Sequence, residues 1–329
     1  MKRSWMKPPG RHERQLYRDR IEWRWYNRFL PEGWRLTGDR VPREEWWSWN
    51  GVDVHLDRLD HPSPRVVVIV LHGGGGNGRV VMTLGPMLRE LGAAVVAPDL
   101  PGYGLTRPRR ARDTTYDRWA ELAADLARAE AERTGLPVVL FGLSLGGLLA
   151  YGTAARAPEV AGVIATTLVD TRTLPGFIRL ARNGALGVAS YPLLPLLPPR
   201  LRAIRFPIRW VAPMHLITND PDFSAVFARD PLAGGASVTL GFLRSLRLFD
   251  VGREPETFAS CPVLVAHPEL DPWTPPELSR AFFDRIAGEK EWVDLEGCGH
   301  LPYEEPGAYQ LAAAVDGFLG RVSDGATRR

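Results

Sequence analysis

Residues 138–156 read VVLFGLSLGGLLAYGTAAR. An apolar run at 138–141 leads into Gly142-Leu143-Ser144-Leu145-Gly146, and a second apolar run of helical length follows. Glycine is needed two positions before and two positions after the serine, because a turn this tight would make larger side chains collide. The stretch therefore predicts a buried strand, a sharp turn that presents the Ser144 hydroxyl above a sheet edge, and a buried helix.

The same stretch approaches the length of a membrane span. It nevertheless contains four glycines and a serine, and it ends at Arg156. A strand, a turn and a helix explain this composition better than a bilayer-spanning helix does. We therefore expect no stable membrane insertion.

Strand and helix patterns alternate on both sides of this turn. Before it, Asn50-Gly51 predicts a tight hairpin turn between two alternating strands. Unbroken apolar runs predict buried strands at 66–71, 94–97, 138–141, 160–165, 263–266 and 291–295, and helical patterns lie near 79–91, 115–133, 145–156, 276–287 and 307–319. The predicted fold class is α/β, with a mostly parallel central sheet flanked by helices and antiparallel strands at its start.

The alternation stops over residues 171–257. Prolines interrupt this segment at Pro175, Pro192, Pro195, Pro198, Pro199, Pro207 and Pro213. Proline at that density leaves no room for another strand–helix repeat. We expect residues 46–170 and 258–322 to form one α/β core, with 171–257 as a helical cap inserted after the sixth strand, over the sheet edge where such folds bind ligands.

Residues 1–45 form an arm rich in tryptophan and arginine. Seven of the eleven tryptophans precede residue 50, including Trp5, Trp23 and Trp34. The preferred interpretation is a helix over roughly 13–29 whose aromatic face packs on the main body. A helix that binds a membrane surface or a partner is the alternative.

Charge and cysteine content set limits on partners and location. The net charge is +3, and residues 1–50 hold twelve Lys and Arg against seven Asp and Glu, so the basic excess belongs to the arm. This distribution predicts no nucleic-acid partner. Cys261 and Cys298 are far apart in the sequence and lack metal-ligand spacing, and the N-terminus shows no apolar leader. Both observations favour a cytoplasmic location. Nothing in the sequence fixes the oligomeric state.

A serine hydroxyl needs an imidazole to take its proton and a carboxylate to orient that imidazole. His300 lies in Gly297-Cys298-Gly299-His300, a flexible loop after the last predicted strand. Asp271 follows the strand at 263–266 and can reach the same sheet edge, while Asp170 and Glu269 are the alternative acids. Ser144, Asp271 and His300 are therefore the predicted catalytic residues.

Acyl transfer also requires hydrogen-bond donors for the oxyanion of a tetrahedral intermediate. The glycine run at 73–76 follows a predicted strand directly, and its backbone can approach a reacting carbonyl closely. The amides of Gly74 and of Leu145, the residue after the serine, are the predicted pair. Gly73 stays open as an alternative donor.

These motifs, in the order Ser144, Asp271, His300 and spread over residues 66–305, resemble the α/β-hydrolase family with a cap domain. Serine as nucleophile is similar to esterases, lipases, thioesterases and C–C bond hydrolases. The resemblance implies an acyl-enzyme mechanism, with no cofactor or metal. Ester hydrolysis is the expected reaction, and thioester, lactone, amide and C–C bond cleavage stay open. Apolar stretches at 193–197 and 238–249 in the expected cap indicate a small molecule with a hydrophobic acyl or aromatic group as the substrate. The arm has no counterpart in the minimal family pattern.

Two alternatives remain. First, Gly73, Gly75 and Gly78 form the motif GxGxxG between a predicted strand and a predicted helix, and Asp99 ends the next strand. This combination is the dinucleotide-binding fingerprint and would indicate an oxidoreductase. That interpretation leaves the placement of Ser144, Asp271 and His300 unexplained. The second alternative is an acyltransferase, or a non-hydrolytic binding protein, on the hydrolase scaffold.

Overall fold

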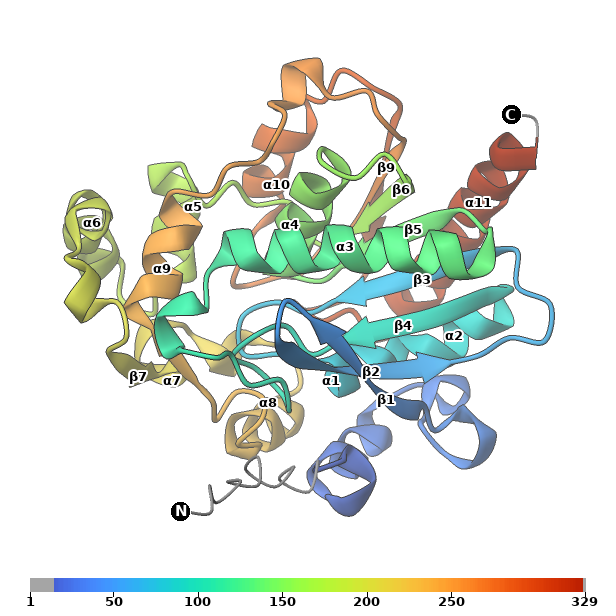
Figure 1. Ribbon diagram of the computed structural model, residues 1–329, viewed down its shortest axis with the longest axis horizontal. Helices are drawn as coiled ribbons and strands as arrows, with labels where there is room; N and C mark the ends of the chain where they lie inside the picture. The colour runs from blue at the N-terminus through green and yellow to red at the C-terminus, as the bar shows by residue number, and fades with distance from the viewer. Residues whose placement is uncertain (1–14, 328–329) are drawn as a thin grey trace, which may run out of the picture.

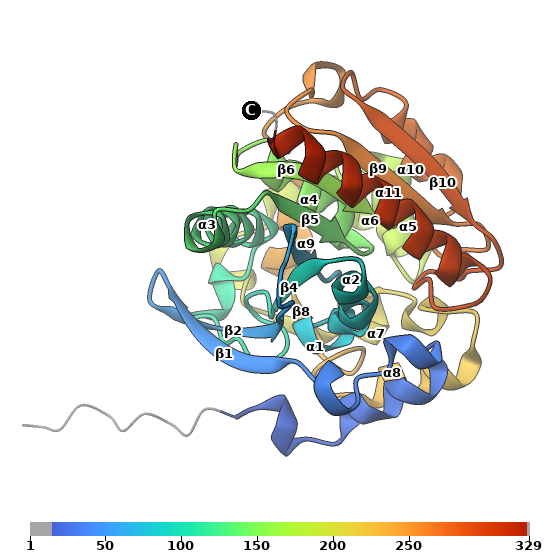
Figure 2. The same ribbon diagram turned by 90° about the vertical axis from the view of Figure 1, so that its right-hand side faces the viewer.

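The protein is built on one eight-stranded sheet (Figures 1 and 2). Its structure, a computed structural model, describes residues 15–327. In spatial order the strands are β1-β2-β4-β3-β5-β6-β9-β10. Their bounds are β1 Arg43–Trp49, β2 Val52–Leu59, β3 Val66–Leu71, β4 Ala93–Pro98, β5 Val138–Gly142, β6 Val160–Ala165, β9 Val263–Pro268 and β10 Lys290–Leu295. The predicted α/β class and every predicted strand are confirmed.

The sheet begins with a hairpin, as the sequence predicted. Asn50 and Gly51 take positive φ angles of 46° and 74°, which a two-residue turn of this kind requires. β1 pairs antiparallel with β2, and β2 pairs antiparallel with β4. From β4 to β10 all neighbours are parallel, so β3, β5 and β9 are covered on both faces and fully buried.

Helices cover both faces of the sheet. α3 (Tyr116–Thr134) and α4 (Leu145–Ala154) lie on one face, and α2 (Gly85–Glu90) and α11 (Gly307–Thr327) on the other (Figures 1 and 2). α10 (Pro276–Phe283) precedes β10. No helix among residues 15–327 combines the length and apolarity needed to cross a membrane.

The helix expected over 79–91 is not continuous. α1 (Gly78–Val81) gives way to a 3-10 turn at Met82–Leu84, and α2 begins anew at Gly85. Pro86 stands in the first turn of α2, where its missing N–H costs nothing, and this position favours a fresh helix start over a continuation.

Residues 171–257 are here called the cap segment, and most of them gather at one end of the molecule (Figure 1). Their helices are α5 (Leu174–Leu180), α6 (Gly184–Leu193), α7 (Ile208–Val211), α8 (Pro221–Arg229) and α9 (Leu240–Arg247). The segment also contains β7 (Arg205–Pro207) and β8 (Ser237–Thr239), which pair antiparallel. The sequence did not predict this ribbon, because three-residue strands are too short to show alternation.

The described part of the arm, residues 15–45, packs on the main body, as predicted. Trp23, Tyr26 and Trp34 are buried. The helix expected over roughly 13–29 is not one continuous helix: within the described residues the arm forms short 3-10 helices, Tyr17–Asp19, Glu22–Phe29, Glu32–Trp34 and Gly38–Arg40. Aromatic residues at every third position, Trp23, Tyr26 and Phe29, suit the three-residue turn of that helix. Trp5 and the start of the predicted helix lie outside the described residues.

Candidate active site

Ser144 stands at the turn between β5 and α4. Its φ of 56° and ψ of −127° are strained for a residue with a side chain. A β-carbon on Gly146 would lie 2.2 Å from the Leu71 carbonyl oxygen, so the strand–turn–helix junction requires glycine there. The turn raises the serine side chain above the carboxyl edge of the sheet.

His300 contacts the serine directly. Its Nε2 lies 2.8 Å from Ser144 Oγ, and its Nδ1 lies 2.8 Å from Asp271 Oδ2. A carboxylate can only accept here, so Nδ1 carries the hydrogen and Nε2 is left to accept the serine proton. The imidazole is fully buried and packs on Trp273, with 4.7 Å between the ring centroids. The structure thus brings together the three residues that the sequence singled out.

Asp271 is held by more than the histidine. Its Oδ1 accepts hydrogen bonds from the amides of Trp273 and Thr274 at 2.8 and 2.9 Å, and its Oδ2 accepts from Thr274 Oγ1 at 2.6 Å. Burial raises the pKa of Asp271, but the facing His300 and the Thr274 bonds outweigh burial and lower it to about 2. The carboxylate is therefore ionised at neutral pH and fixed in direction.

Thr274 is a site residue whose role the sequence analysis missed. It does not cap the following helix, because the N-cap of α10 is Pro275, and its hydroxyl binds Asp271 instead. The alternative acids are engaged elsewhere. Asp170 accepts two bonds from the Arg172 guanidinium, and the exposed Glu269 accepts the Gly297 amide at 3.3 Å.

The two predicted oxyanion donors lie beside the serine. Leu145 is the first residue of α4, so its amide has no carbonyl partner within the helix. Gly74 lines the same cavity as Ser144, and a β-carbon on it would lie 3.2 Å from Leu145 Cδ1. Gly73 is closer to the serine, since its β-carbon would lie 2.9 Å from Ser144 Cβ. Gly73 and Gly74 thus both lie in the immediate surroundings of Ser144 and Leu145.

Two further histidines support loops at this edge. The His72 Nε2 accepts the Leu100 amide at 3.0 Å, and its Nδ1 donates to the Gly73 carbonyl at 2.8 Å. Burial lowers the pKa of His72 to about 4, so the ring is neutral and its two bonds are fixed. His267 likewise donates to the Pro268 carbonyl.

The GxGxxG interpretation conflicts with the surroundings of Asp99. That carboxylate is fully buried and accepts the amides of Gly78 and Leu105 at 2.7 and 2.6 Å. In the dinucleotide fold the equivalent acid must be free to bind ribose hydroxyls. Here Asp99 serves the protein's own backbone.

One group of acidic and imidazole side chains in the described part of the chain has metal-site spacing: Glu44, His55 and Asp57. Arg79 occupies this group. Its guanidinium donates to both oxygens of Asp57 at 2.5 and 2.8 Å and lies 3.5 Å from Glu44. Because the arginine already supplies the positive charge, these residues do not fit a metal ion.

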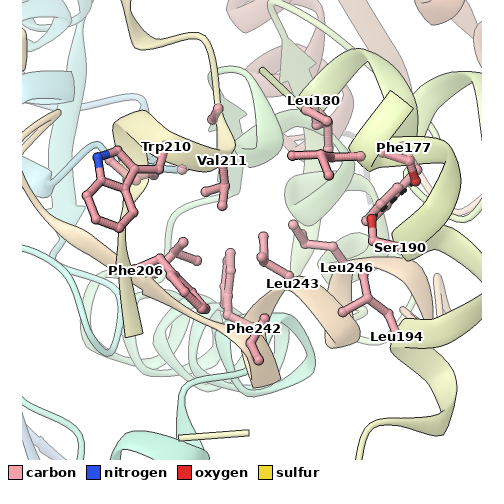
Figure 3. A pocket seen from close by; sticks show the side chains of 18 of the residues that line it. Phe177, Leu180, Ser190, Leu194, Phe206, Trp210, Val211, Phe242, Leu243 and Leu246 are labelled. Atoms are coloured by element: carbon pink, nitrogen blue, oxygen red, sulfur yellow. Dashed lines mark hydrogen bonds between the residues drawn. The ribbon is translucent and has the colours of Figure 1, made fainter. Parts of the chain in front are cut away.

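Ser144 opens into a cavity of about 510 Å³ between the sheet edge and the cap segment. Phe177, Leu180, Phe206, Phe242 and Leu243 are among the cap side chains directed at it (Figure 3). None of the described residues that line it carries a formal charge. Ser144 therefore lines an apolar chamber of the size that encloses small-molecule ligands.

The sequence model of the serine aminopeptidase S33 family matches residues 62–307. The chain belongs to this family. Among curated relatives, phospholipase YtpA of Bacillus subtilis is 25% identical over 83% of this chain and 98% of its own length. The monoacylglycerol lipase of Mycolicibacterium smegmatis is 25% identical over 74% of this chain and 84% of its own.

Solved structures agree on the fold of this S33 member. The monoacylglycerol lipase of Paleococcus ferrophilus superposes with a TM-score of 0.65 at 23% identity, covering 82% of this chain and 99% of that one. A soluble variant of monoglyceride lipase from Saccharomyces cerevisiae gives 0.70 at 17% identity, with 86% and 96% covered. The chain is an α/β hydrolase of the esterase and lipase type, as predicted, and the oxidoreductase and non-hydrolytic alternatives are not favoured.

Proposed function

We propose that this S33-family protein hydrolyses carboxylic esters of long apolar acyl groups through an acyl-enzyme on Ser144. The observation that carries the proposal is the serine hydroxyl, which lies 2.8 Å from His300 Nε2 and belongs to a residue that lines an uncharged cavity. A nucleophile paired with a base supplies acyl-transfer chemistry, and an apolar chamber selects an apolar acyl group.

In the first half-reaction the Ser144 oxygen attacks the ester carbonyl carbon while His300 Nε2 takes the hydroxyl proton. The carbonyl π electrons move onto oxygen and form a tetrahedral oxyanion. When the carbon–oxygen bond to the alcohol breaks, His300 returns the proton to the departing alkoxide. An ester between Ser144 and the acyl group remains.

In the second half-reaction water replaces the alcohol. His300 takes one proton from the water, the hydroxide oxygen attacks the acyl carbon, and the proton passes to Ser144 as the acid is released. Asp271 keeps its charge throughout and stabilises the imidazolium that forms in each half-reaction. The amides of Gly74 and Leu145 stabilise the oxyanion of both tetrahedral intermediates.

The cap segment supports an acyl chain of considerable length. Leu186, Leu193 and Trp210 line the cavity and are also exposed, at 66%, 63% and 61% of their surface. Exposed apolar side chains that also line the cavity favour contact with an apolar substrate at this side of the cap segment. The relatives named monoacylglycerol lipase and phospholipase are lipid hydrolases by name, which supports an ester with an apolar acyl group as the substrate.

The test is a comparison of kcat/KM across one series of nitrophenyl esters, from acetyl to palmitoyl, followed by monoacylglycerols of the preferred chain. We expect kcat/KM to rise with chain length until the cavity is filled. Preference for the acetyl ester would overturn the substrate class, and absence of hydrolysis across the series would overturn the activity.

A further inference from the structure

The arm lies outside residues 62–307, the part of the chain that matches the S33 family. It contacts both the core beside α1 and α2 and the cap segment at α8 (Figure 2). Two of its tyrosines, Tyr17 and Tyr26, are buried with their hydroxyls on carboxylates of the main body. Through these carboxylates, both hydroxyls are connected by hydrogen bonds to the start of α1.

The first tyrosine reaches the start of α1. Tyr17 donates its hydroxyl to the Asp99 carboxylate, 3.1 Å from each oxygen. Asp99 in turn accepts the Gly78 amide at 2.7 Å. Gly78 is the first residue of α1 and directly follows the loop that carries Gly74, one of the two proposed oxyanion donors.

Tyr26 is connected to Asn77, the residue before Gly78, by hydrogen bonds through the cap segment. The Tyr26 hydroxyl donates to Asp230 Oδ2 at 2.9 Å, and Asp230 Oδ1 accepts the Leu232 amide at 2.9 Å. The Leu232 carbonyl then accepts Asn77 Nδ2, also at 2.9 Å. Asn77 is the N-cap of α1, with its Oδ1 on the Val80 amide.

The following residue, Arg79, is covered by the arm as well. Its guanidinium lies 4.9 Å from the ring centroid of Tyr17 and 4.8 Å from that of Trp23. Its side chain is only 1% exposed, and it forms the ion pair with Asp57 described above. Cation–π contacts of this kind strengthen when the cation is removed from water.

Three consecutive residues, Asn77, Gly78 and Arg79, are therefore anchored through the arm, immediately after the glycine run at 73–76. Glycines have no side chains with which to fix their own amides, so the anchors at the end of the run restrict where those amides point. We infer that the arm positions the oxyanion loop, with Tyr17 and Tyr26 as positioning residues for Gly74. This inference rests on the proposed function, since it assigns a task to the same site.

The test compares Tyr17→Phe and Tyr26→Phe with Tyr151→Phe. Each substitution keeps the ring and removes one buried hydroxyl bond, and the Tyr151 hydroxyl binds the Arg253 carbonyl instead of the network around residues 77–79. Because loss of a whole oxyanion donor costs about 100- to 1,000-fold in kcat, we expect a displaced donor to lower kcat by about tenfold. KM for a short soluble ester should stay unchanged, and Tyr151→Phe should keep the wild-type kcat.

Hydrogen exchange of the peptide spanning 72–79 provides a second readout that needs no turnover. We expect faster exchange there in Tyr17→Phe and Tyr26→Phe than in wild type or Tyr151→Phe. Variants that melt earlier but keep both kcat and the exchange rate at a temperature where they are folded would overturn the inference. A wild-type protein that hydrolyses no ester would refute the proposed function alone, and unchanged exchange would refute the anchoring.

Discussion

Gly142 and Gly146 approach each other so closely across the turn at Ser144 that a β-carbon on Gly142 would lie 1.9 Å from the Gly146 carbonyl oxygen. The obstacle is backbone, which cannot rotate away as a side chain can. The turn that raises the nucleophile therefore depends on both glycines.

Gly142→Ala should destabilise the protein by at least about 1–3 kcal/mol, the usual cost of forcing extra atoms into a packed site. Urea unfolding measures the change. Gly33→Ala is the matched control, because a β-carbon at Gly33 meets nothing within 4 Å. Equal stability of the two variants would show that the turn is looser than described.

Ser144→Gly should raise the free energy of unfolding while it removes activity. Ser144 holds a φ of 56°, and glycine adopts such angles without the strain of about 1–3 kcal/mol that a side chain brings. A gain of about 1 kcal/mol in urea unfolding is the expected result. A loss of stability would argue against strain at the nucleophile.

Asp271→Asn should lower kcat by about 10,000-fold, as loss of the orienting carboxylate does in other serine hydrolases with such a triad. The amide would favour the wrong imidazole tautomer. Asp170→Asn tests the alternative acid and should leave kcat near the wild-type value, because Asp170 binds Arg172. Similar losses in both variants would contradict the assignment.

The Asp271 carboxylate should also make the free energy of unfolding depend on pH in the acid range. Despite burial, His300 and Thr274 lower the pKa of Asp271 to about 2. An aspartate in the unfolded chain titrates near about 3.9, so the stability that this group contributes is complete above about pH 4 and is lost as pH falls toward 2.

Over that range the free energy of unfolding of wild type should fall on the order of 2 kcal/mol further than that of Asp271→Asn. Glu44, whose pKa the His55 hydrogen bond lowers to about 2 despite burial, contributes in both proteins and cancels. Denaturant titrations at each pH give the comparison. Parallel curves for the two proteins would show that Asp271 is not stabilised in its ionised form.

Leu243→Trp should shift the ester preference toward shorter acyl chains. The Leu243 side chain points into the cavity, and an indole there would occupy part of its 510 Å³ (Figure 3). Leu243→Met keeps the volume and should keep the wild-type preference. An unchanged chain-length profile in Leu243→Trp would place the acyl group elsewhere.

Most of the fold and the reacting groups could be predicted from the sequence because both depend on local patterns. The run from Val138 to Ala155 shows strand, turn and helix without reference to the rest of the chain, and His300 and Asp271 follow strands that end at the same edge. Thr274 was missed because its hydroxyl could serve a helix or a carboxylate, and only the folded loop distinguishes them.

The contacts of the arm and the cap segment could not be predicted in the same way. Tyr26 meets Asp230 across 204 residues of sequence, and no spacing rule links such a pair. β7 and β8 are three residues each and show no period. In the arm, packing of the aromatic residues on the main body was predicted correctly, but their spacing does not by itself distinguish one long helix from the short 3-10 helices that form.

The most direct test of Ser144 as the nucleophile is to locate a fluorophosphonate adduct by peptide mass spectrometry. Such a probe reacts with a serine only when a neighbouring base activates it. We expect an adduct on Ser144 and none on the folded Ser144→Ala protein, together with loss of ester hydrolysis in that variant. An adduct on another residue, or hydrolysis unchanged in Ser144→Ala, would contradict this role of Ser144.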